Sequence, residues 1–220
     1  MKAIRHLGCE NSLFNVFISE LRSIDHQKDS MRFRRNLERI GEIFAYEISK
    51  GFEYEEKEIV TPLGIANMNL FPQYPVLATI LRAGLPMHQG LLNYFDKADN
   101  AFISAFRKHH RDGTFEIQVD YISSPILENR ILILSDPMLA TGKSMYLAYQ
   151  ELLSNGKPLH THFVSAIASV QGIAYLQSKL SPAKCTIWVG AVDEELTAQS
   201  YIVPGLGDAG DLAYGNKTAE

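Results

Sequence analysis

The sequence predicts an α/β protein built on a doubly wound, mostly parallel sheet flanked by helices. Five apolar runs of strand length occur along the chain, and helical patterns lie between several of them. Runs that are apolar on both faces are typical of a buried parallel sheet. Strands that alternate with helices imply right-handed βαβ crossovers. The expected strands are residues 76–81, 101–106, 131–135, 162–168 and 185–191.

The first expected helix precedes these strands. Its apolar residues recur at steps of four and three, which keeps them within one stripe of a helix: Phe33, Leu37, Ile40, Phe44 and Ile48. Gly51 is expected to end it, because glycine is common just after a helix. Three further helices are expected between the strands, at residues 85–94, 144–153 and 172–180.

One segment departs from the alternation of strand and helix. Asp112-Gly113 is a strong two-residue hairpin signal. After it, apolar side chains at every second position from Phe115 to Tyr121 indicate a half-exposed strand that pairs back on residues 108–111. We expect a hairpin over residues 107–123 that projects from the sheet end, where it can cover a site.

Composition and length exclude several classes of protein. The 220 residues are 46% hydrophobic and 21% charged, which excludes intrinsic disorder and a disulfide scaffold. A net charge of −4 argues against a general nucleic-acid binder. No apolar run approaches the roughly 20 residues of a membrane span, and the N-terminus lacks a signal-peptide pattern. We expect one domain over residues 1–220, soluble and cytoplasmic, with residues 1–30 as an N-terminal extension of unassigned role.

The two cysteines, Cys9 and Cys185, lie far apart in the sequence and form no spaced ligand set. One disulfide between them is an alternative. The favoured interpretation is two unpaired, buried thiols, which are consistent with a reducing compartment. The cysteines therefore agree with a cytoplasmic protein.

The strongest local motif follows the third expected strand. Asp136 ends this apolar run, Thr141 and Gly142 follow in a short loop, and a helix begins near Lys143. Backbone N–H groups at a helix start favour an anion, and glycine lets the backbone approach it closely. In parallel sheets, ligands bind beyond the carboxyl ends of the strands. The motif predicts a phosphate cradle beside a carboxylate; the alternative is an ordinary loop with a Ser/Thr cap.

The Gly142-Lys143-Ser144 triplet also suggests a nucleoside-triphosphate loop. That loop needs a glycine five residues before the Gly-Lys pair, where this chain has Pro137. Proline supplies no N–H and fixes φ, so the backbone cannot wrap a triphosphate there. The carboxylate of Asp136 would also repel phosphates unless it met sugar hydroxyls or a metal. A ribose 5-phosphate therefore fits this loop better.

Three segments carry a resemblance to a known family. Residues 136–144 (Asp-Pro-Met-Leu-Ala-Thr-Gly-Lys-Ser) closely resemble the phosphoribosyl-pyrophosphate loop of uracil phosphoribosyltransferases. Residues 80–87 resemble that family's strand-end arginine loop, and residues 201–211 (Tyr-Ile-Val-Pro-Gly-Leu-Gly-Asp-Ala-Gly-Asp) its C-terminal uracil-binding segment. The similarity runs from about Arg32 to Gly215. The C-terminal motif is highly specific to this family, whereas other phosphoribosyltransferases share the phosphate loop.

The resemblance implies a fold, a reaction and a set of small-molecule partners. The fold is the type I phosphoribosyltransferase fold, with its projecting hairpin and a C-terminal base-binding region over residues 193–215. The reaction is uracil plus 5-phosphoribosyl 1-diphosphate (PRPP) giving uridine 5′-phosphate (UMP) and diphosphate, in pyrimidine salvage. Mg²⁺ is the implied cofactor, bound mainly through substrate oxygens and water, without a protein metal site. Family members form dimers, sometimes tetramers, and some respond to GTP; we expect a homodimer or higher homo-oligomer, with GTP activation left open.

The resemblance also implies site residues. Catalytic roles fall on Arg82, Arg107, Asp136 and Asp208. The implied PRPP-binding set is Arg82, Arg107, Asp136, Pro137, Met138, Leu139, Ala140, Thr141, Gly142, Lys143, Ser144 and Asp208. Uracil is expected at Ile202, Gly207, Asp208 and Ala209, mostly through backbone groups.

Three positions depart from the family pattern. Lys143 stands where the family usually has glycine, Leu212 where it typically has a basic residue, and residues 108–111 are more basic than usual. Two other functions stay open at this point: a phosphoribosyltransferase for another base, and a regulatory relative that binds nucleotide or RNA without turnover. The C-terminal segment disfavours the first, and intact Arg82 and Asp136 disfavour the second.

Overall fold

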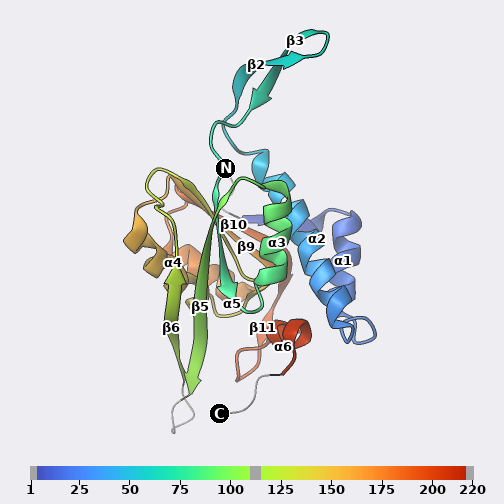
Figure 1. The fold of residues 1–220 in the computed structure, drawn as a ribbon. Helices are drawn as coiled ribbons and strands as arrows, with labels where there is room; N and C mark the ends of the chain where they lie inside the picture. Colours follow the sequence, from blue (N-terminus) through green and yellow to red (C-terminus); the bar gives the residue numbers. More distant parts are fainter. Residues whose placement is uncertain (1–3, 110–114, 217–220) are drawn as a thin grey trace.

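The computed structural model describes residues 4–109 and 115–216. Within them, eight strands form one twisted sheet, parallel at every pairing except β5 with β6 (Figure 1). β8 (Met138–Leu139) adds to β9 beyond the end of β7. Across the sheet, the other strands are β1 (Ile4–His6), β10 (Cys185–Asp193), β9 (His160–Ser169), β7 (Ile131–Ser135), β4 (Val76–Leu81), β5 (Asp99–His109) and β6 (Phe115–Ser123).

Helices cover both faces of this sheet (Figure 1). α1 (Leu13–Arg22), α2 (Ser30–Ser49) and α3 (Leu85–Tyr94) bury one apolar cluster with strand residues such as Leu77 and Ile133. α4 (Lys143–Leu152) and α5 (Val170–Lys179) bury a second cluster with Val76 and Leu132. Because neighbouring residues of a strand point to opposite faces, runs that are apolar throughout supply both clusters. Two short 3₁₀ helices are η1 (Leu7–Cys9) and η2 (Leu153–Asn155).

The expected fold class and each expected strand and helix of the sheet are confirmed. β4, α3 and β7 have the expected bounds, and the other predicted elements differ by a few residues at their ends. α2 begins at Ser30, three residues before the apolar stripe, because Asp29 caps it: Oδ1 of Asp29 accepts from the N–H of Arg32 at 3.0 Å. It ends at Ser49, two residues before Gly51.

The expected hairpin is present as β5 and β6, which project beyond the rest of the sheet (Figure 1). Arg107 pairs with Ile117, and a register shift at Ser104/Ala105 marks where the projecting part begins. The Asp112-Gly113 turn lies outside the described residues. The side chains of residues 105–119 are also outside the description.

Two parts of the structure were not predicted. The N-terminal residues belong to the core, because β1 extends the sheet beside β10 and α1 buries Phe14 and Leu21. A separate two-stranded arm, β2 (Glu55–Thr61) and β3 (Gly64–Leu70), extends away from the body (Figure 1). Near the C-terminus, β11 (Glu195–Leu196) pairs with β12 (Ile202–Val203), and α6 spans Ala209–Tyr214.

Both cysteines are free, but the expectation that both are buried is wrong for one of them. Cys185 lies in the interior at the start of β10, whereas Cys9 is exposed. The physical reason is position: η1 follows the outermost strand, so Cys9 lies at the rim of the sheet. Among the described helices, none is long and apolar enough to cross a membrane.

Candidate active site

Two predicted site loops begin side by side at the carboxyl edge of the sheet. β4 and β7 are parallel neighbours, with Thr79 opposite Ser135. The hydroxyl of Thr79 donates to the carbonyl of Ser135 at 3.1 Å, and the hydroxyl of Ser135 donates to the carbonyl of Ala78 at 3.2 Å. Both hydroxyls are buried and lock the strand ends together. Arg82 and Asp136 follow these ends directly, so the sheet brings their loops to one place.

The loop that starts at Asp136 is anchored by backbone bonds to β9. The N–H of Asp136 donates to the carbonyl of Val164 at 3.0 Å. The carbonyl of Pro137 accepts from the N–H of Ile167 at 3.0 Å, and the two residues after it form β8. Pro137 and Leu139 are buried, while Met138 and the side chain of Asp136 are half-buried. The loop therefore has a fixed course rather than a flexible one.

The underside of this loop rests on the first turn of α5. The Ser169 hydroxyl donates to the carbonyl of Ala140 at 2.6 Å and accepts from the N–H of Gly172 at 2.8 Å. A Cβ atom at Gly172 would overlap the carbonyl oxygens of Leu139 and Ala140. Position 172 must therefore be glycine for the loop to lie this close to α5. Sequence reasoning placed Gly172 in a helix but missed this contact.

α4 begins at the end of the predicted phosphate loop, where a helix start was expected. Gly142 has φ +76° and is the residue just before α4, where it has no side chain to cap the helix. The Thr141 hydroxyl accepts from the N–H of Lys143 at 3.4 Å. Lys143 is exposed, and Thr141 and Ser144 are half-buried. Uncapped N–H groups, two hydroxyls and a cation at a helix start can bind a phosphate group.

Arg82 lies against the C-terminal helix. Its side chain is 42% exposed, and Nη2 lies 3.2 Å from the carbonyl of Gly215 and 3.4 Å from Oδ1 of Asp211. A Cβ atom at Gly210 would be 3.2 Å from Oδ1 of Asp208 and 3.9 Å from Nη2 of Arg82. The structure therefore gathers Arg82 and Asp208, which are far apart in sequence, around the start of α6.

The predicted uracil-binding residues surround tight turns before α6. Ile202 and Ala209 are buried, and Asp208 caps α6 by accepting from the N–H of Asp211 at 3.0 Å. Gly207 has φ +92°, a conformation that other residues rarely adopt. An ordered helix, a strand pair and buried anchors replace the flexible tail that composition alone suggests.

Leu212, one of the three departures from the family pattern, has an apolar role. It is half-buried and packs against the core cluster beneath α1 and α2. Its Cδ1 would be 3.9 Å from a Cβ atom at Gly207. Leu212 therefore supports the turn at Gly207 by packing rather than by a polar contact.

Arg107 is the predicted site residue with the least structural definition. Its backbone lies on β5, three residues beyond Ser104, which pairs with the last residue of β4. Its side chain falls in the part that is not described. The site role of Arg107 therefore stays a prediction.

Two residues that were not predicted from the sequence, Arg22 and Asp193, form bonds beside the segment expected to bind uracil. Arg22, the last residue of α1, forms a two-bond ion pair with Asp193, the last residue of β10. The strand-end rule applied to residues 185–193 points to Asp193. No comparable signal marks Arg22, because α1 was not expected.

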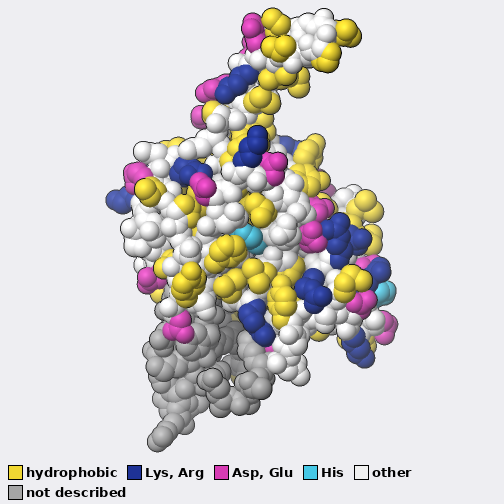
Figure 2. Space-filling model, in the orientation of Figure 1, with side chains coloured by type: hydrophobic (Ala, Val, Ile, Leu, Met, Phe, Trp, Pro, Cys, Tyr) yellow, Lys and Arg dark blue, Asp and Glu magenta, His cyan; other side chains and the backbone are white. Residues whose placement is uncertain are grey.

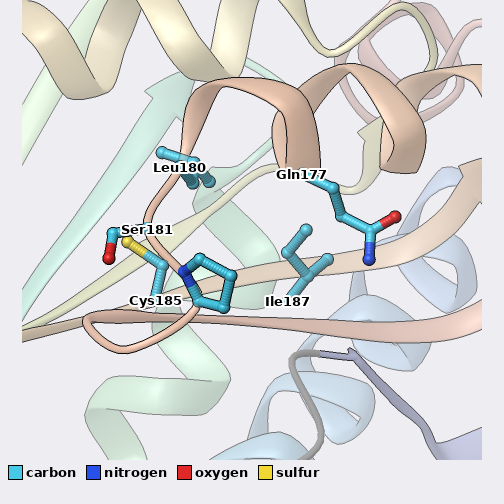
Figure 3. A pocket seen from close by; sticks show the side chains of 6 residues that line it. Gln177, Leu180, Ser181, Cys185 and Ile187 are labelled. Carbon is cyan, nitrogen blue, oxygen red and sulfur yellow. The ribbon is translucent and has the colours of Figure 1, made fainter.

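Two cavities of the described residues are lined by none of residues 136–144. A small one of about 40 Å³ lies between the end of α5 and the start of β10, far from the carboxyl edge (Figure 3). It holds no more than a few waters. A shallow cleft of about 470 Å³ lies along α3 and reaches Arg34 and Tyr214. Burial raises the pKa of the Tyr214 phenol, and the nearby charges of Arg34 and Arg82 lower it by a smaller amount.

A helix start suited to phosphate, beside a carboxylate at the end of a parallel strand, is an arrangement typical of α/β proteins that bind sugar phosphates at the carboxyl edge of the sheet. The family model for uracil phosphoribosyltransferase matches residues 9–216, so the chain belongs to the uracil phosphoribosyltransferase family. This match includes the three segments that carried the resemblance. It confirms the expected family and its fold.

Relatives are similar over nearly the whole chain. A uracil phosphoribosyltransferase of Porphyromonas gingivalis is 53% identical over 212 residues, covering 96% of this chain and 98% of the relative. One from Methanothermobacter thermautotrophicus is 38% identical and covers 85% of each chain. The solved structure of the AQ2163 protein from Aquifex aeolicus has a TM-score of 0.85 at 32% identity, covering 96% of this chain and 98% of that one.

Proposed function

We propose that this chain transfers the 5-phosphoribosyl group of PRPP to uracil, giving UMP and diphosphate, in pyrimidine salvage. One observation carries the proposal. Arg82, from the loop after β4, bonds to Asp211 of α6 and to Gly215, and α6 directly follows the segment expected to bind uracil. An arginine for diphosphate and a base-reading segment thus adjoin the phosphate loop. Relatives that carry the name of this enzyme match over nearly the full length.

The reaction forms a bond from uracil N1 to the anomeric carbon and breaks the bond from that carbon to the diphosphate oxygen. Uracil N1 loses its proton, and diphosphate leaves with the electron pair. Positive charge develops on the ribose and negative charge on the diphosphate. Arg82 and Arg107 stabilise the diphosphate, because a guanidinium presents a planar fork of donors to phosphate. Asp136 holds the ribose hydroxyls as the ring becomes positive.

The 5′-phosphate binds at the start of α4. Residues 140–144 supply N–H groups, hydroxyls and the Lys143 ammonium. Pro137, Met138 and Leu139 contribute by fixing the backbone course through β9. Because these anchors are bonds to β9 rather than to substrate, little ordering should be required on binding.

Uracil is read mainly by backbone groups of Ile202, Gly207 and Ala209, with Asp208 beside them. A backbone N–H always donates and a carbonyl always accepts, so rotation cannot swap their polarity. Cytosine presents the opposite pattern at its exocyclic group. A fixed backbone therefore rejects cytosine by leaving groups unpaired.

Mg²⁺ is the proposed cofactor, and the carboxylates fit a substrate-borne ion. Within the described ranges, no group of three or more His, Cys, Asp or Glu side chains could hold a metal. Mg²⁺ keeps several waters and uses one or two carboxylates with substrate phosphates. Asp136 and Asp208 are the carboxylates that we propose lie near the ion, and the bound ion would neutralise diphosphate charge.

We also propose a homodimer in which the β2–β3 arm lies on a second copy. Along the arm, apolar side chains face solvent, including Leu63 at 100% and Val60 at 85% exposed (Figure 2). An isolated two-stranded hairpin is marginally stable in water, and exposed apolar patches mark association sites.

Leu63→Asp with Val60→Glu is expected to lower the mass in sedimentation to that of a monomer. Leu13→Glu, on the similarly exposed surface of α1, is the control; an unchanged mass in the double variant contradicts the arm.

The function is tested by incubating the protein with Mg²⁺, PRPP and each pyrimidine or purine base in turn. Formation of UMP and diphosphate from uracil is expected. Turnover of hypoxanthine but not uracil would exclude the proposed substrate, and no turnover with any base would favour a regulatory relative. The same assay with GTP tests activation.

Two free cysteines fit a reducing compartment, which supports the cytoplasm as the site of the reaction.

A further inference from the structure

The segment expected to bind uracil is tied to the N-terminal helix by an ion pair. Nη1 of Arg22 lies 2.8 Å from Oδ2 of Asp193, and Nη2 lies 2.8 Å from Oδ1. The Asp193 side chain is 7% exposed and that of Arg22 24%. Two parallel bonds between a guanidinium and a carboxylate fix orientation as well as distance.

The same two side chains hold Gly205. Its N–H donates to Oδ2 of Asp193 at 2.9 Å, and its carbonyl accepts from Nη1 of Arg22 at 3.1 Å. Gly205 has φ +56°, and a Cβ atom there would overlap the carbonyl of Ile202. The ion pair therefore holds both polar backbone groups of a turn that is folded tightly onto Ile202.

This turn sits in the middle of the base-reading residues. Gly205 is three residues after Ile202 and two before Gly207. The carbonyl of Arg22 accepts from Nε2 of Gln27 at 3.1 Å, and Oε1 of Gln27 would be 4.0 Å from a Cβ atom at Gly207. The end of α1 therefore holds the turn at Gly205 directly, and Gln27, which bonds to Arg22, lies near the next turn at Gly207.

We propose that Arg22 and Asp193 are positioning residues for uracil recognition: they fix the backbone that reads the base. This inference rests on the proposed function. When recognition uses backbone groups, a small shift of the turn misplaces every donor and acceptor, and affinity and selectivity fall together. The phosphate loop is held instead by β9 and α5, so PRPP binding should depend on this pair much less than uracil binding does.

A purely stabilising role explains the pair poorly. Removing two charges from water costs about as much as their attraction returns, so buried ion pairs contribute little net stability compared with apolar packing. Their geometry, in contrast, is highly specific. Here the geometry acts on Gly205, which lies between the proposed contacts to uracil.

The test uses Arg22→Gln, Arg22→Lys and Asp193→Asn in the full chain. Arg22→Gln and Asp193→Asn are expected to raise the uracil KM at least about tenfold, the loss of one charge-assisted hydrogen bond. The Kd for PRPP with Mg²⁺ should stay within about twofold, and discrimination against cytosine should fall. Arg22→Lys keeps the charge but loses the fork, so an intermediate uracil KM is expected.

Arg32→Gln is the matched control. Arg32 makes a similar two-bond pair with Glu20 of α1, through Nε at 2.9 Å and Nη2. This pair ties α1 to α2 and makes no described contact with residues 193–208. The uracil KM of Arg32→Gln should equal that of the wild type. An equal rise in this control, an equal rise in the PRPP Kd, or an unchanged uracil KM in folded Arg22→Gln would overturn the inference.

Hydrogen exchange separates this inference from the proposed function. If the wild type makes no UMP, the function fails, but the amides of residues 202–208 still report on positioning. Faster exchange there in Arg22→Gln than in Arg32→Gln supports the inference, and equal exchange overturns it. If Arg22→Gln does not fold, Arg22→Lys decides in the same way.

Discussion

Nη2 of Arg82 lies 3.4 Å from Oδ1 of Asp211, joining the loop after β4 to α6 across 129 residues of sequence. The guanidinium is 42% exposed. Exposed ion pairs contribute little stability, so an anion that binds Arg82 would displace this carboxylate at low cost. The contact therefore leaves Arg82 accessible to the diphosphate that we propose it binds.

Arg82→Gln is expected to raise the PRPP KM about tenfold to a hundredfold and to lower kcat, because charged hydrogen bonds to the departing diphosphate are lost. Steady-state kinetics with uracil and PRPP measure this effect. Arg35→Gln is the control, since Arg35 pairs with Glu38 on the surface of α2. Equal kinetics in the two variants would remove Arg82 from the site.

Asp136→Asn is expected to lower kcat by about a hundredfold or more, because the amide cannot stabilise positive charge on the ribose. The fold should persist, since the backbone N–H of Asp136 keeps its bond to Val164. Circular dichroism and kcat are the measurements. Asp99→Asn is the control: Asp99 is the exposed partner of Arg130 at the start of β5. Near-normal turnover in Asp136→Asn would exclude it from the mechanism.

Truncation before Tyr201 is expected to abolish uracil binding and to spare part of the PRPP binding. The deletion removes Ile202 and Gly207 but leaves the phosphate loop anchored on β9. PRPP binding should weaken, since Asp208 is also lost. Calorimetric titration with each substrate measures both. Deletion of residues 217–220 alone is the control. Uracil affinity that survives the longer deletion would place the base site elsewhere.

The sequence predicted those elements whose pattern is local. Strand residues 76–81 and 131–135 are apolar except for Thr79 and Ser135, and their length and spacing were sufficient to assign them. The course of the loop after residue 135, from strand to loop to helix, was predictable because its pattern lies within nine consecutive residues. Its role in binding phosphate stays a prediction.

What escaped prediction depends on contacts between distant segments. Gly172 is required by the carbonyl of Ala140 below the phosphate loop, and a single sequence shows no such contact. The bond between Arg22 and Asp193 spans 171 positions. β2 shows neither alternation nor an apolar run, and its side chains face solvent on both sides. β3 alternates Ala66, Met68 and Leu70 with two asparagines, but this short pattern was not used to assign a strand.

His162 makes stability depend on pH, since it is buried at 8% exposure and its Nδ1 accepts from Nε1 of Trp188 at 3.0 Å. Burial, with a smaller effect of His160, lowers the His162 pKa to about 3. The unfolded chain, with an ordinary pKa of 6.5, takes up a proton that the folded chain does not. The free energy of unfolding is therefore full above pH 6.5 and falls from there towards pH 3. Urea unfolding should show His162→Gln losing about 1–2 kcal/mol less than wild type between pH 7 and 5. Equal losses in His162→Gln, wild type and the exposed control His26→Gln would contradict this.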